Sequence, residues 1–290
     1  MYAQDFNELG FICSNWPLKP EQPTLLFVHG AGLNHAQWQA QMIGLRDKAN
    51  LIAVDLPGHA LSAHHDGEQS ISAYADNLAE LCDYLNCQQL VPVGHSMGGA
   101  VCLEFATRYL QHLSGLVLLN TGAKLKVMPE MLEKIHTDYP GFVQMITDQA
   151  MTDGADVELL EPFADLMLQS DLQTVINDFS ACNQFDLMDS LPEITCPTLV
   201  LSAELDMMTP PKYGQFLSDQ LPDSHFEVIH GAAHLSPIEH PQEINDAIGR
   251  CSLPLANSIN LFLTYISHKP CRMSSGYNPE DISTYTKASL

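Results

Sequence analysis

Short apolar runs and longer amphipathic segments alternate along most of the chain. Six runs are too short for helices and are apolar on both faces, as in strands of a parallel sheet that is covered on both sides. They lie at 25–28, 51–54, 90–93, 115–119, 198–201 and 226–229. Segments with the apolar spacing of helices lie between several of them, at 34–48, 72–86, 97–109 and 212–220. This alternation predicts an α/β fold built on a mostly parallel, doubly wound sheet.

The alternation stops at about residue 124 and resumes after residue 191. The spacing in between is helical throughout, with candidate helices at 129–138, 142–150, 156–169 and 171–183. An all-helical insertion of this size between two strands is typical of a lid over the strand ends. The predicted organisation is a core made of 1–123 and 192–250, a lid made of 124–191, and a partly disordered C-terminal extension at 251–290.

The charge and cysteine content exclude several classes of protein. The 290 residues include 35 Asp and Glu against 12 Lys and Arg, a net charge of −23. This charge repels a phosphate backbone and an anionic bilayer, which argues against nucleic-acid and membrane partners. The N-terminus shows no secretory signal, and the eight cysteines, without a C-x-x-C pair, are typical of reduced thiols in a cytoplasmic protein. The oligomeric state stays open.

The strongest chemical signal is a G-x-S-x-G motif at residues 94–98, between an apolar strand and a helix. A serine at such a turn sits in a strained backbone conformation, and its neighbours two positions away must be small for the chain to pass. The turn presents the hydroxyl of Ser96 at the carboxyl end of the sheet, beside the positive N-terminus of the helix. Ser96 is therefore the predicted nucleophile.

A serine nucleophile needs a base, and the base needs an orienting acid. Asp206 and His234 each follow a predicted strand, so both belong at the same edge of the sheet as Ser96. The chain order serine, aspartate, histidine is the one expected when the serine occupies a strand-to-helix turn.

Position along the chain decides among rival candidates for the acid and the base. Glu204 lies closer to the end of its strand than Asp206 does. His230 is still next to its strand and His240 lies beyond a proline, whereas His234 falls in the loop. Asp206 and His234 are therefore the predicted acid and base.

The loop at 29–32 supplies a further element. A developing oxyanion needs two backbone N–H donors that point at one position. Met97, the residue after the nucleophile, supplies one, and the loop supplies the other, most simply through Ala31. His29 is interpreted as a structural hydrogen-bonding residue and not as a second base.

Two other interpretations of these loops are weaker. The G-A-G at 30–32, with Asp55 at the end of the next strand, resembles a dinucleotide-binding fingerprint. His35 occupies the place of its third small residue, and the serine, aspartate and histidine would be left unexplained, so no cofactor is predicted. The His-His-Asp run at 64–66 has no matching ligand cluster, so no metal is predicted. Asp55 and His59 are expected to hold their loop together.

Taken together, these motifs resemble those of the α/β-hydrolase fold family over roughly residues 20–250. The matching segments are HGAGLNHAQW (29–38), DLPGHALS (55–62), VGHSMGG (93–99), PTLVLSAELDMMTP (197–210) and GAAHLSPIEHP (231–241). The resemblance implies a core sheet with a helical lid after the sixth strand, and a triad of Ser96, Asp206 and His234. Ala60 replaces the glycine usual in the D-x-P-G-H-G-x-S stretch, and the residues after 250 exceed the usual ending.

These observations predict a cofactor-free serine hydrolase, in first place a carboxylesterase that cleaves small to medium uncharged esters through an acyl-enzyme. A lactonase, a carbon–carbon bond hydrolase with the same triad and a ligand receptor on the same fold stay open, because the motifs do not distinguish substrates. Apolar residues of the predicted lid are candidates for the acyl pocket: Met128, Met131, Phe142, Met145, Phe163, Met167 and Met188. An uncharged substrate is expected because residues 130–190 carry a net charge of −12, which lowers the local concentration of anions.

Overall fold

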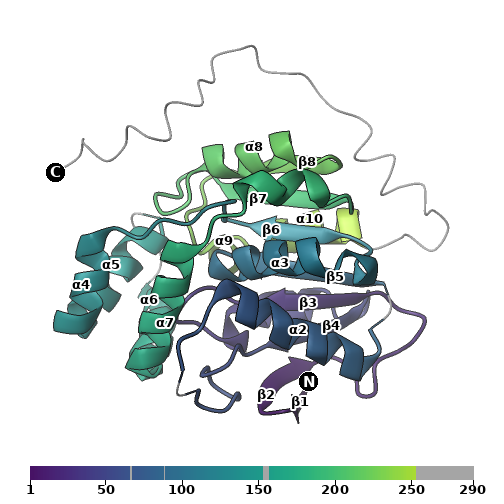
Figure 1. Cartoon of the computed structure of the whole chain (residues 1–290), viewed down its shortest axis with the longest axis horizontal. Helices are drawn as coiled ribbons and strands as arrows, with labels where there is room; N and C mark the ends of the chain where they lie inside the picture. The colour runs from purple at the N-terminus through teal and green to yellow at the C-terminus, as the bar shows by residue number, and fades with distance from the viewer. Residues whose placement is uncertain (66, 88, 153–156, 253–290) are drawn as a thin grey trace.

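The computed structural model describes residues 1–65, 67–87, 89–152 and 157–252, so the predicted C-terminal extension lies outside it apart from its first two residues. In this part of the chain eight strands form one sheet, in the order β1-β2-β4-β3-β5-β6-β7-β8 (Figure 1). The strands are β1 (Tyr2–Phe6), β2 (Leu9–Cys13), β3 (Thr24–Val28), β4 (Asn50–Val54), β5 (Leu90–His95), β6 (Leu116–Leu119), β7 (Thr198–Ala203) and β8 (Ser224–Ile229). β3 to β8 are parallel to one another, which confirms the predicted mostly parallel α/β fold.

The sequence analysis did not predict the first two strands. β1 and β2 form an antiparallel hairpin whose turn holds Asn7 and Glu8 at positive φ, 48° and 68°. β2 then pairs antiparallel with β4, where Phe11 lies opposite Val54. These strands escaped prediction because no helix follows either of them, and the alternation of strand and helix identified the others.

Helices cover both faces of the sheet (Figure 1). They are α1 (Gln39–Gly44), α2 (Ile71–Leu85), α3 (Met97–Arg108), α8 (Pro211–Gln220), α9 (Ser236–Glu239) and α10 (Pro241–Ser252), with the 3₁₀ helices η1 (His35–Trp38) and η2 (Leu110–His112). The predicted helix at 34–48 is thus two short ones, η1 and α1. One buried cluster joins α2, α3 and α8 to the sheet through Tyr74, Phe105 and Leu217. The cluster on the other face joins α1 and α10 through Met42 and Ile248.

Alternate residues of each central strand enter these two clusters. Leu26 and Val28 of β3 belong to the first cluster, and Leu25 and Phe27 belong to the second. Because successive side chains of a strand point to opposite faces, a strand that is buried on both faces is apolar at consecutive positions. This is the physical basis of the apolar runs in the sequence.

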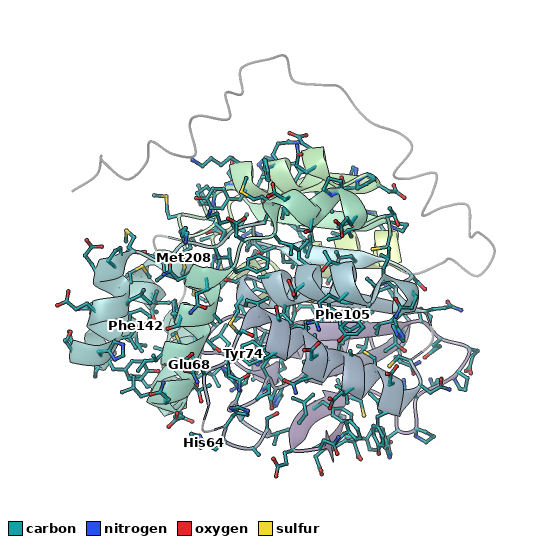
Figure 2. All side chains as sticks on the ribbon, viewed as in Figure 1. His64, Glu68, Tyr74, Phe105, Phe142 and Met208 are labelled. Carbon is teal, nitrogen blue, oxygen red and sulfur yellow. The ribbon has the colours of Figure 1, made fainter. Side chains whose placement is uncertain are left out.

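Within the described residues, four helices are inserted between β6 and β7 and lie to one side of the sheet, at the left of Figure 1. They are α4 (Pro129–Thr137), α5 (Tyr139–Ala150), α6 (Val157–Gln169) and α7 (Leu172–Gln184), and the 3₁₀ helix η3 (Met188–Glu193) follows them. We call α4 to α7 the insertion. It has a buried cluster of its own, which includes Phe142, Phe163 and Phe179, and Figure 2 labels Phe142 in it. The predicted helices agree with these bounds to within a few residues.

Aspartate side chains cap the N-termini of two of the inserted helices and so determine where these helices begin. Asp138 accepts a hydrogen bond from the Gly141 N–H at the start of α5, and Asp171 accepts one from the Thr174 N–H at the start of α7, each at 3.0 Å. Side-chain acceptors at these positions satisfy N–H groups that lack a partner within the helix. None of the described helices combines the length and the apolar composition that crossing a bilayer requires.

Candidate active site

Ser96 occupies the turn between β5 and α3. Its backbone has φ 53° and ψ −118°, a conformation that residues with a side chain rarely adopt. The Ser96 N–H donates to the Leu119 carbonyl oxygen at 3.0 Å, which ties the turn to the neighbouring strand. A Cβ on Gly94 would lie 2.3 Å from the Gly98 carbonyl oxygen, and a Cβ on Gly98 would lie 2.1 Å from the Val28 carbonyl oxygen. Both glycines of the motif are therefore required by packing.

Asp206 and His234 lie in the loops after β7 and β8 and contact each other directly. The His234 Nδ1 lies 2.8 Å from the Asp206 Oδ2. Because an ionised carboxylate only accepts hydrogen bonds, Nδ1 carries the proton and Nε2 is the basic nitrogen. The Asp206 Oδ1 accepts from the backbone N–H groups of Met208 and Thr209, each at 2.8 Å, and the Thr209 hydroxyl donates to Oδ2 at 2.7 Å.

The surroundings of Asp206 keep it ionised. The residue is only 2% exposed, and burial by itself raises the pKa of its carboxyl group. The His234 ring and the hydrogen bonds from Thr209 outweigh this effect, so the pKa of Asp206 is lowered. A permanent negative charge therefore lies beside the imidazole of His234.

The rival candidates for the acid and the base, Glu204, His230 and His240, contact residues other than Asp206 and His234. Glu204 accepts from the Gly231 N–H at 2.9 Å and lies 3.3 Å from the ring of His230, with both side chains largely exposed. His240 lies 3.5 Å from Glu243 on the following helix. Of the predicted acids and bases, it is Asp206 and His234 that the fold brings together.

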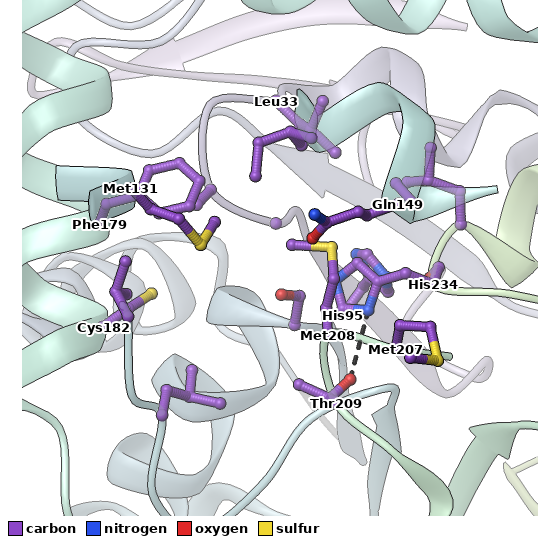
Figure 3. A pocket seen from close by; sticks show the side chains of 18 of the residues that line it. Leu33, His95, Met131, Gln149, Phe179, Cys182, Met207, Met208, Thr209 and His234 are labelled. Atoms are coloured by element: carbon purple, nitrogen blue, oxygen red, sulfur yellow. Dashed lines mark hydrogen bonds between the residues drawn. The ribbon is translucent and has the colours of Figure 1, made fainter. Parts of the chain in front are cut away.

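Ser96 and His234 line the same cavity, which has a volume of about 210 Å³. Figure 3 shows His234 beside His95 and Met208, with its ring hydrogen-bonded to Thr209. Among the described residues, no hydrogen bond joins the Ser96 hydroxyl to His234. Such contacts are often long in ligand-free proteins and shorten when a substrate binds. Ser96 and His234 therefore meet at one cavity, and the contact between His234 and Asp206 is already formed.

The two predicted oxyanion donors also lie at this place. Ala31 lines the cavity, and Met97 is the first residue of α3. The Gly30 carbonyl oxygen accepts from the Leu33 N–H at 3.2 Å and from the His29 Nδ1 at 2.9 Å. Because the C=O and N–H of a trans peptide point in opposite directions, the Ala31 N–H points away from these donors. Within the described ranges neither the Ala31 N–H nor the Met97 N–H has a hydrogen-bond acceptor.

Two buried residues that the sequence analysis did not single out hold His234 in place. The Asn120 Nδ2 donates to the His234 carbonyl oxygen at 2.6 Å, and its Oδ1 accepts from the Ala203 N–H at 2.8 Å. The His95 Nε2 donates to the same His234 carbonyl oxygen at 2.8 Å. Burial lowers the pKa of His95 to about 3, so its ring is neutral. No motif marks Asn120, because its partners come from the last residue of β7 and from the loop after β8.

Two residues of the dinucleotide-like pattern have structural partners. The His29 Nε2 accepts from the Leu56 N–H at 3.1 Å, and burial lowers the pKa of His29 to about 4, so its ring is neutral. Asp55 is fully buried and accepts from the backbone N–H of His35 at 2.7 Å and from its Nδ1 at 2.8 Å. These contacts keep Asp55 from reaching a ribose. In the described ranges no three His, Cys, Asp or Glu side chains gather as metal ligands, and Asp66 lies outside them.

The walls of the cavity are mostly apolar. Three of the residues predicted for the pocket line it: Met128, Met131 and Phe163. Four pack elsewhere: Phe142, Met145 and Met167 in the cluster of the insertion, and Met188 against the cluster of α2, α3 and α8. Figure 3 shows Phe179 and Cys182 on the side of Met131, with Met207 and Met208 near His234. Helical spacing marks a residue as buried and does not tell whether it faces a neighbour or a cavity.

The polar residues of the walls carry little charge. Three have long polar side chains: Lys126, Gln149 and Tyr213. Lys126 is exposed, and its Nζ donates to the Asn183 carbonyl oxygen at 2.9 Å. Lys124, which does not line the cavity, lies 2.5 Å from Asp186. No Asp or Glu of the described residues lines the cavity.

Residues 25–247 match the family described as the alpha/beta hydrolase family. The match covers more than half of the chain, and the sheet order and the serine turn agree with it. The protein belongs to the alpha/beta hydrolase family.

Named relatives are similar to this protein over most of its length. 3-Oxoadipate enol-lactonase 2 from Acinetobacter baylyi is 26% identical over 243 residues, 79% of this chain and 88% of that protein. A pimeloyl-[acyl-carrier protein] methyl ester esterase from Vibrio vulnificus is 28% identical over 243 residues, 79% of this chain and 93% of that protein. The structure of a thermophilic esterase from Thermogutta terrifontis has a TM-score of 0.74 and 31% identity, and the match covers 83% of this chain and 91% of that one. These similarities support hydrolase activity and leave the substrate open.

Proposed function

We propose that the protein is a cofactor-free serine hydrolase that cleaves small to medium uncharged carboxylic esters. Ser96 is the nucleophile, His234 the general base and Asp206 the orienting acid. The observation that carries the proposal is the 2.8 Å contact between His234 and Asp206 beside a cavity that Ser96 also lines. The esterases among the similar proteins agree with this assignment.

In the proposed mechanism, the Ser96 Oγ attacks the ester carbonyl carbon while the His234 Nε2 takes the hydroxyl proton. The N–H groups of Ala31 and Met97 bind the negative charge that develops on the carbonyl oxygen. His234 then gives its proton to the leaving oxygen, and the alcohol departs from an acyl-enzyme. A water molecule loses a proton to His234 and attacks the acyl carbon. Ser96 leaves with the proton from His234, which releases the carboxylic acid.

The insertion, in this proposal, is a lid that forms the acyl-binding part of the cavity. Met131, Phe163 and Phe179 come from the insertion and line the cavity. Transfer of a charged group from water to an apolar wall without a partner is unfavourable. This supports an uncharged acyl group.

A lactonase is the second candidate, because one of the relatives is named an enol-lactonase. A lactone is a cyclic ester, so the same steps open its ring. The alcohol produced then stays attached to the acid.

Hydrolysis of a panel of nitrophenyl esters and lactones by the purified protein tests the proposal. We expect ester turnover, and we expect Ser96→Ala to lower kcat by about 10³-fold or more. Ser96 should also be labelled by a fluorophosphonate, and labelling that survives Ser96→Ala would place the nucleophile elsewhere. Faster turnover of lactones favours the second candidate. Cleavage of a β-diketone alone points to a carbon–carbon bond hydrolase, and binding without any turnover points to a receptor.

We also propose a cytoplasmic location. The cysteines of the described residues are free thiols, as in a reducing compartment; they are Cys13, Cys82, Cys87, Cys102, Cys182 and Cys196. Fractionation of cells that express the tagged protein tests this location, and recovery from an oxidising compartment contradicts it.

A further inference from the structure

The carboxylate of Asp178 is fully buried where the insertion meets the rest of the fold. It lies on α7, yet its hydrogen bonds go to three groups outside the insertion. The Gly32 N–H donates to Oδ2 at 2.8 Å, the His59 Nε2 donates to Oδ2 at 2.9 Å, and the Tyr74 hydroxyl donates to Oδ1 at 2.7 Å. Figure 2 labels Tyr74 near the end of α2 that faces α7. The proposed mechanism uses none of these four groups.

The surroundings of His59 favour its charged form, in which the contact with Asp178 is a buried ion pair. The His59 Nδ1 lies 3.1 Å from the Leu56 carbonyl oxygen, and its Nε2 faces the Asp178 carboxylate, so both nitrogens meet acceptors and carry protons. Burial by itself lowers the pKa of His59, but Asp178 and Asp55 outweigh it and the pKa is raised. Burial likewise raises the pKa of Asp178, and His59 outweighs it, so that pKa is lowered. The ring centre of His29 lies 4.6 Å from that of His59, and His29 is neutral. Tyr74 and Cys182 also lie near Asp178, and their raised pKa values keep both uncharged.

Stability alone does not account for this pair. Removing two charges from water is costly, and well-packed apolar residues of similar size often hold two elements together equally well. The partners of Asp178 indicate a second role for it. One of them, Gly32, belongs to the loop that carries the proposed oxyanion donor Ala31.

The insertion holds both polar groups of Gly32, which has φ 69°. Asp178 binds the Gly32 N–H, and the Ser170 hydroxyl donates to the Gly32 carbonyl oxygen at 3.2 Å. The Ala31–Gly32 peptide plane is therefore oriented from the insertion. The preceding plane is oriented by Leu33, whose N–H donates to the Gly30 carbonyl oxygen. The Ala31 N–H lies in this preceding plane, and Asp178 holds the plane that follows, so the backbone on both sides of Ala31 is fixed.

We propose that Asp178 is a positioning residue for the oxyanion site. By accepting from the Gly32 N–H, it holds the peptide that follows Ala31 and so keeps the loop in the conformation in which the Ala31 N–H can meet the carbonyl oxygen of the substrate, and it does so from the insertion that encloses the acyl group. Binding of the acyl group and formation of the oxyanion site are thereby linked. This inference rests on the proposed function, because it assigns Asp178 a role in that mechanism.

Asp178→Ala removes the acceptor for the Gly32 N–H, and its effect should be specific to the transition state. Loss of a whole oxyanion donor costs about 10² to 10³ in kcat. A donor that is present but misdirected should cost about 10-fold to 100-fold, with KM changed by less than about 2-fold. Asp178→Asn should restore part of kcat, since its amide oxygen can still accept from the Gly32 N–H while its NH₂ group faces the Tyr74 hydroxyl oxygen.

The inhibition constant of a boronic acid distinguishes a positioning role of Asp178 from a merely structural one. Its tetrahedral adduct with Ser96 places an oxygen at the oxyanion site, so its inhibition constant should rise by the same factor as kcat falls. The matched control is Asn177→Ala. Asn177 is the preceding residue on α7, and its Nδ2 donates to the Gly67 carbonyl oxygen at 3.0 Å without contact with the oxyanion loop. In this control, kcat and the inhibition constant of the boronic acid should both stay within about 2-fold of their values in the native protein.

The outcomes separate this inference from the proposed function. A fall in kcat with a matching loss of boronate affinity supports the role of Asp178. Unchanged kcat with a raised KM, or equal effects of Asp178→Ala and Asn177→Ala, overturns it even when Ser96→Ala is inactive. Activity that survives Ser96→Ala overturns the proposed function itself. Should Asp178→Ala not fold, Asp178→Asn and Tyr74→Phe decide, because each should lower kcat a few-fold with unchanged KM.

Discussion

The substitution Asp206→Asn tests the proposed triad through the tautomer of its histidine. Asp206 Oδ1 accepts from two backbone N–H groups, those of Met208 and Thr209. An asparagine at this position must present its single amide oxygen to these two donors. Its NH₂ group then occupies the place of Oδ2 and faces the His234 Nδ1, which lies 2.8 Å away in the native protein. An NH₂ group can only donate, so Nδ1 becomes an acceptor and the ring proton moves to Nε2.

The predicted loss of activity follows from this proton. With a hydrogen on Nε2, His234 has no lone pair directed at the Ser96 hydroxyl and cannot act as a base. A wrong tautomer in an otherwise intact triad costs about 10⁴ in kcat. This factor corresponds to about 5.5 kcal/mol of transition-state stabilisation. KM should change little, because the contact lies behind the imidazole and away from the bound acyl group.

The assay is steady-state hydrolysis of a nitrophenyl ester at neutral pH, with a thermal melt to verify that the variant is folded. Glu204→Gln is the matched control, since Glu204 is a largely exposed acid on the same loop and should leave kcat within about 2-fold. An Asp206→Asn variant that is folded and keeps more than about a tenth of native kcat would refute the assignment of Asp206. A large loss in Glu204→Gln instead would identify the rival acid.

Three further predictions concern stability and substrate choice. The raised pKa of His59 contributes stability that is complete below its unfolded value of about 6.5 and is lost as the pH rises through its folded value. The difference in the free energy of unfolding between the native protein and His59→Gln, measured by urea titration, should therefore narrow above about pH 6.5, by at most about 1.4 kcal/mol per pH unit, and a difference that widens would contradict the ion pair. Gly98→Ala should lower the free energy of unfolding by about 1–3 kcal/mol in urea titrations, because its Cβ would lie 2.1 Å from the Val28 carbonyl oxygen; an unchanged midpoint would show that the turn can relax. A neutral ester should have a higher kcat/KM than its ω-carboxylate analogue, with a gap that narrows as NaCl is added. A preference for the carboxylate that disappears in Lys126→Met would show that Lys126 binds the acid directly.

The serine turn could be predicted because its requirements are local. Ser96, Gly94 and Gly98 fall within five consecutive residues, and a side chain at Gly94 would meet the helix that follows the turn. A side chain at Gly98 would meet the end of β3, so the motif also reflects one contact that is distant in the sequence. The parallel strands could be predicted for a related reason, since burial on both faces makes consecutive residues apolar. The β1–β2 hairpin is followed by no helix, so the alternation of strand and helix did not mark it, and the structure shows it as an antiparallel addition to the sheet beside β4.

The choice of Asp206 and His234 over their rivals was an inference from chain position. It agrees with the fold because the carboxyl ends of parallel strands lie at one edge of the sheet. Position alone did not identify Asn120, whose side chain joins the end of β7 to the loop after β8. A buried asparagine at the end of a strand has no pattern that distinguishes it from an ordinary turn residue.

The sequence by itself determined the fold class, the order of the parallel strands with their helices, and the choice of Ser96, Asp206 and His234 at the strand ends. These features could be predicted because the steric limits of the backbone and the side-chain periodicity of strands and helices both involve residues that are close together in the sequence. The tertiary structure alone decided which apolar residues of the insertion line the cavity, and that Asp178 binds the loop at Gly32. Those two residues are 146 positions apart. Their contact depends on how α7 packs against the rest of the fold, and the pattern along α7 shows only which of its residues are buried.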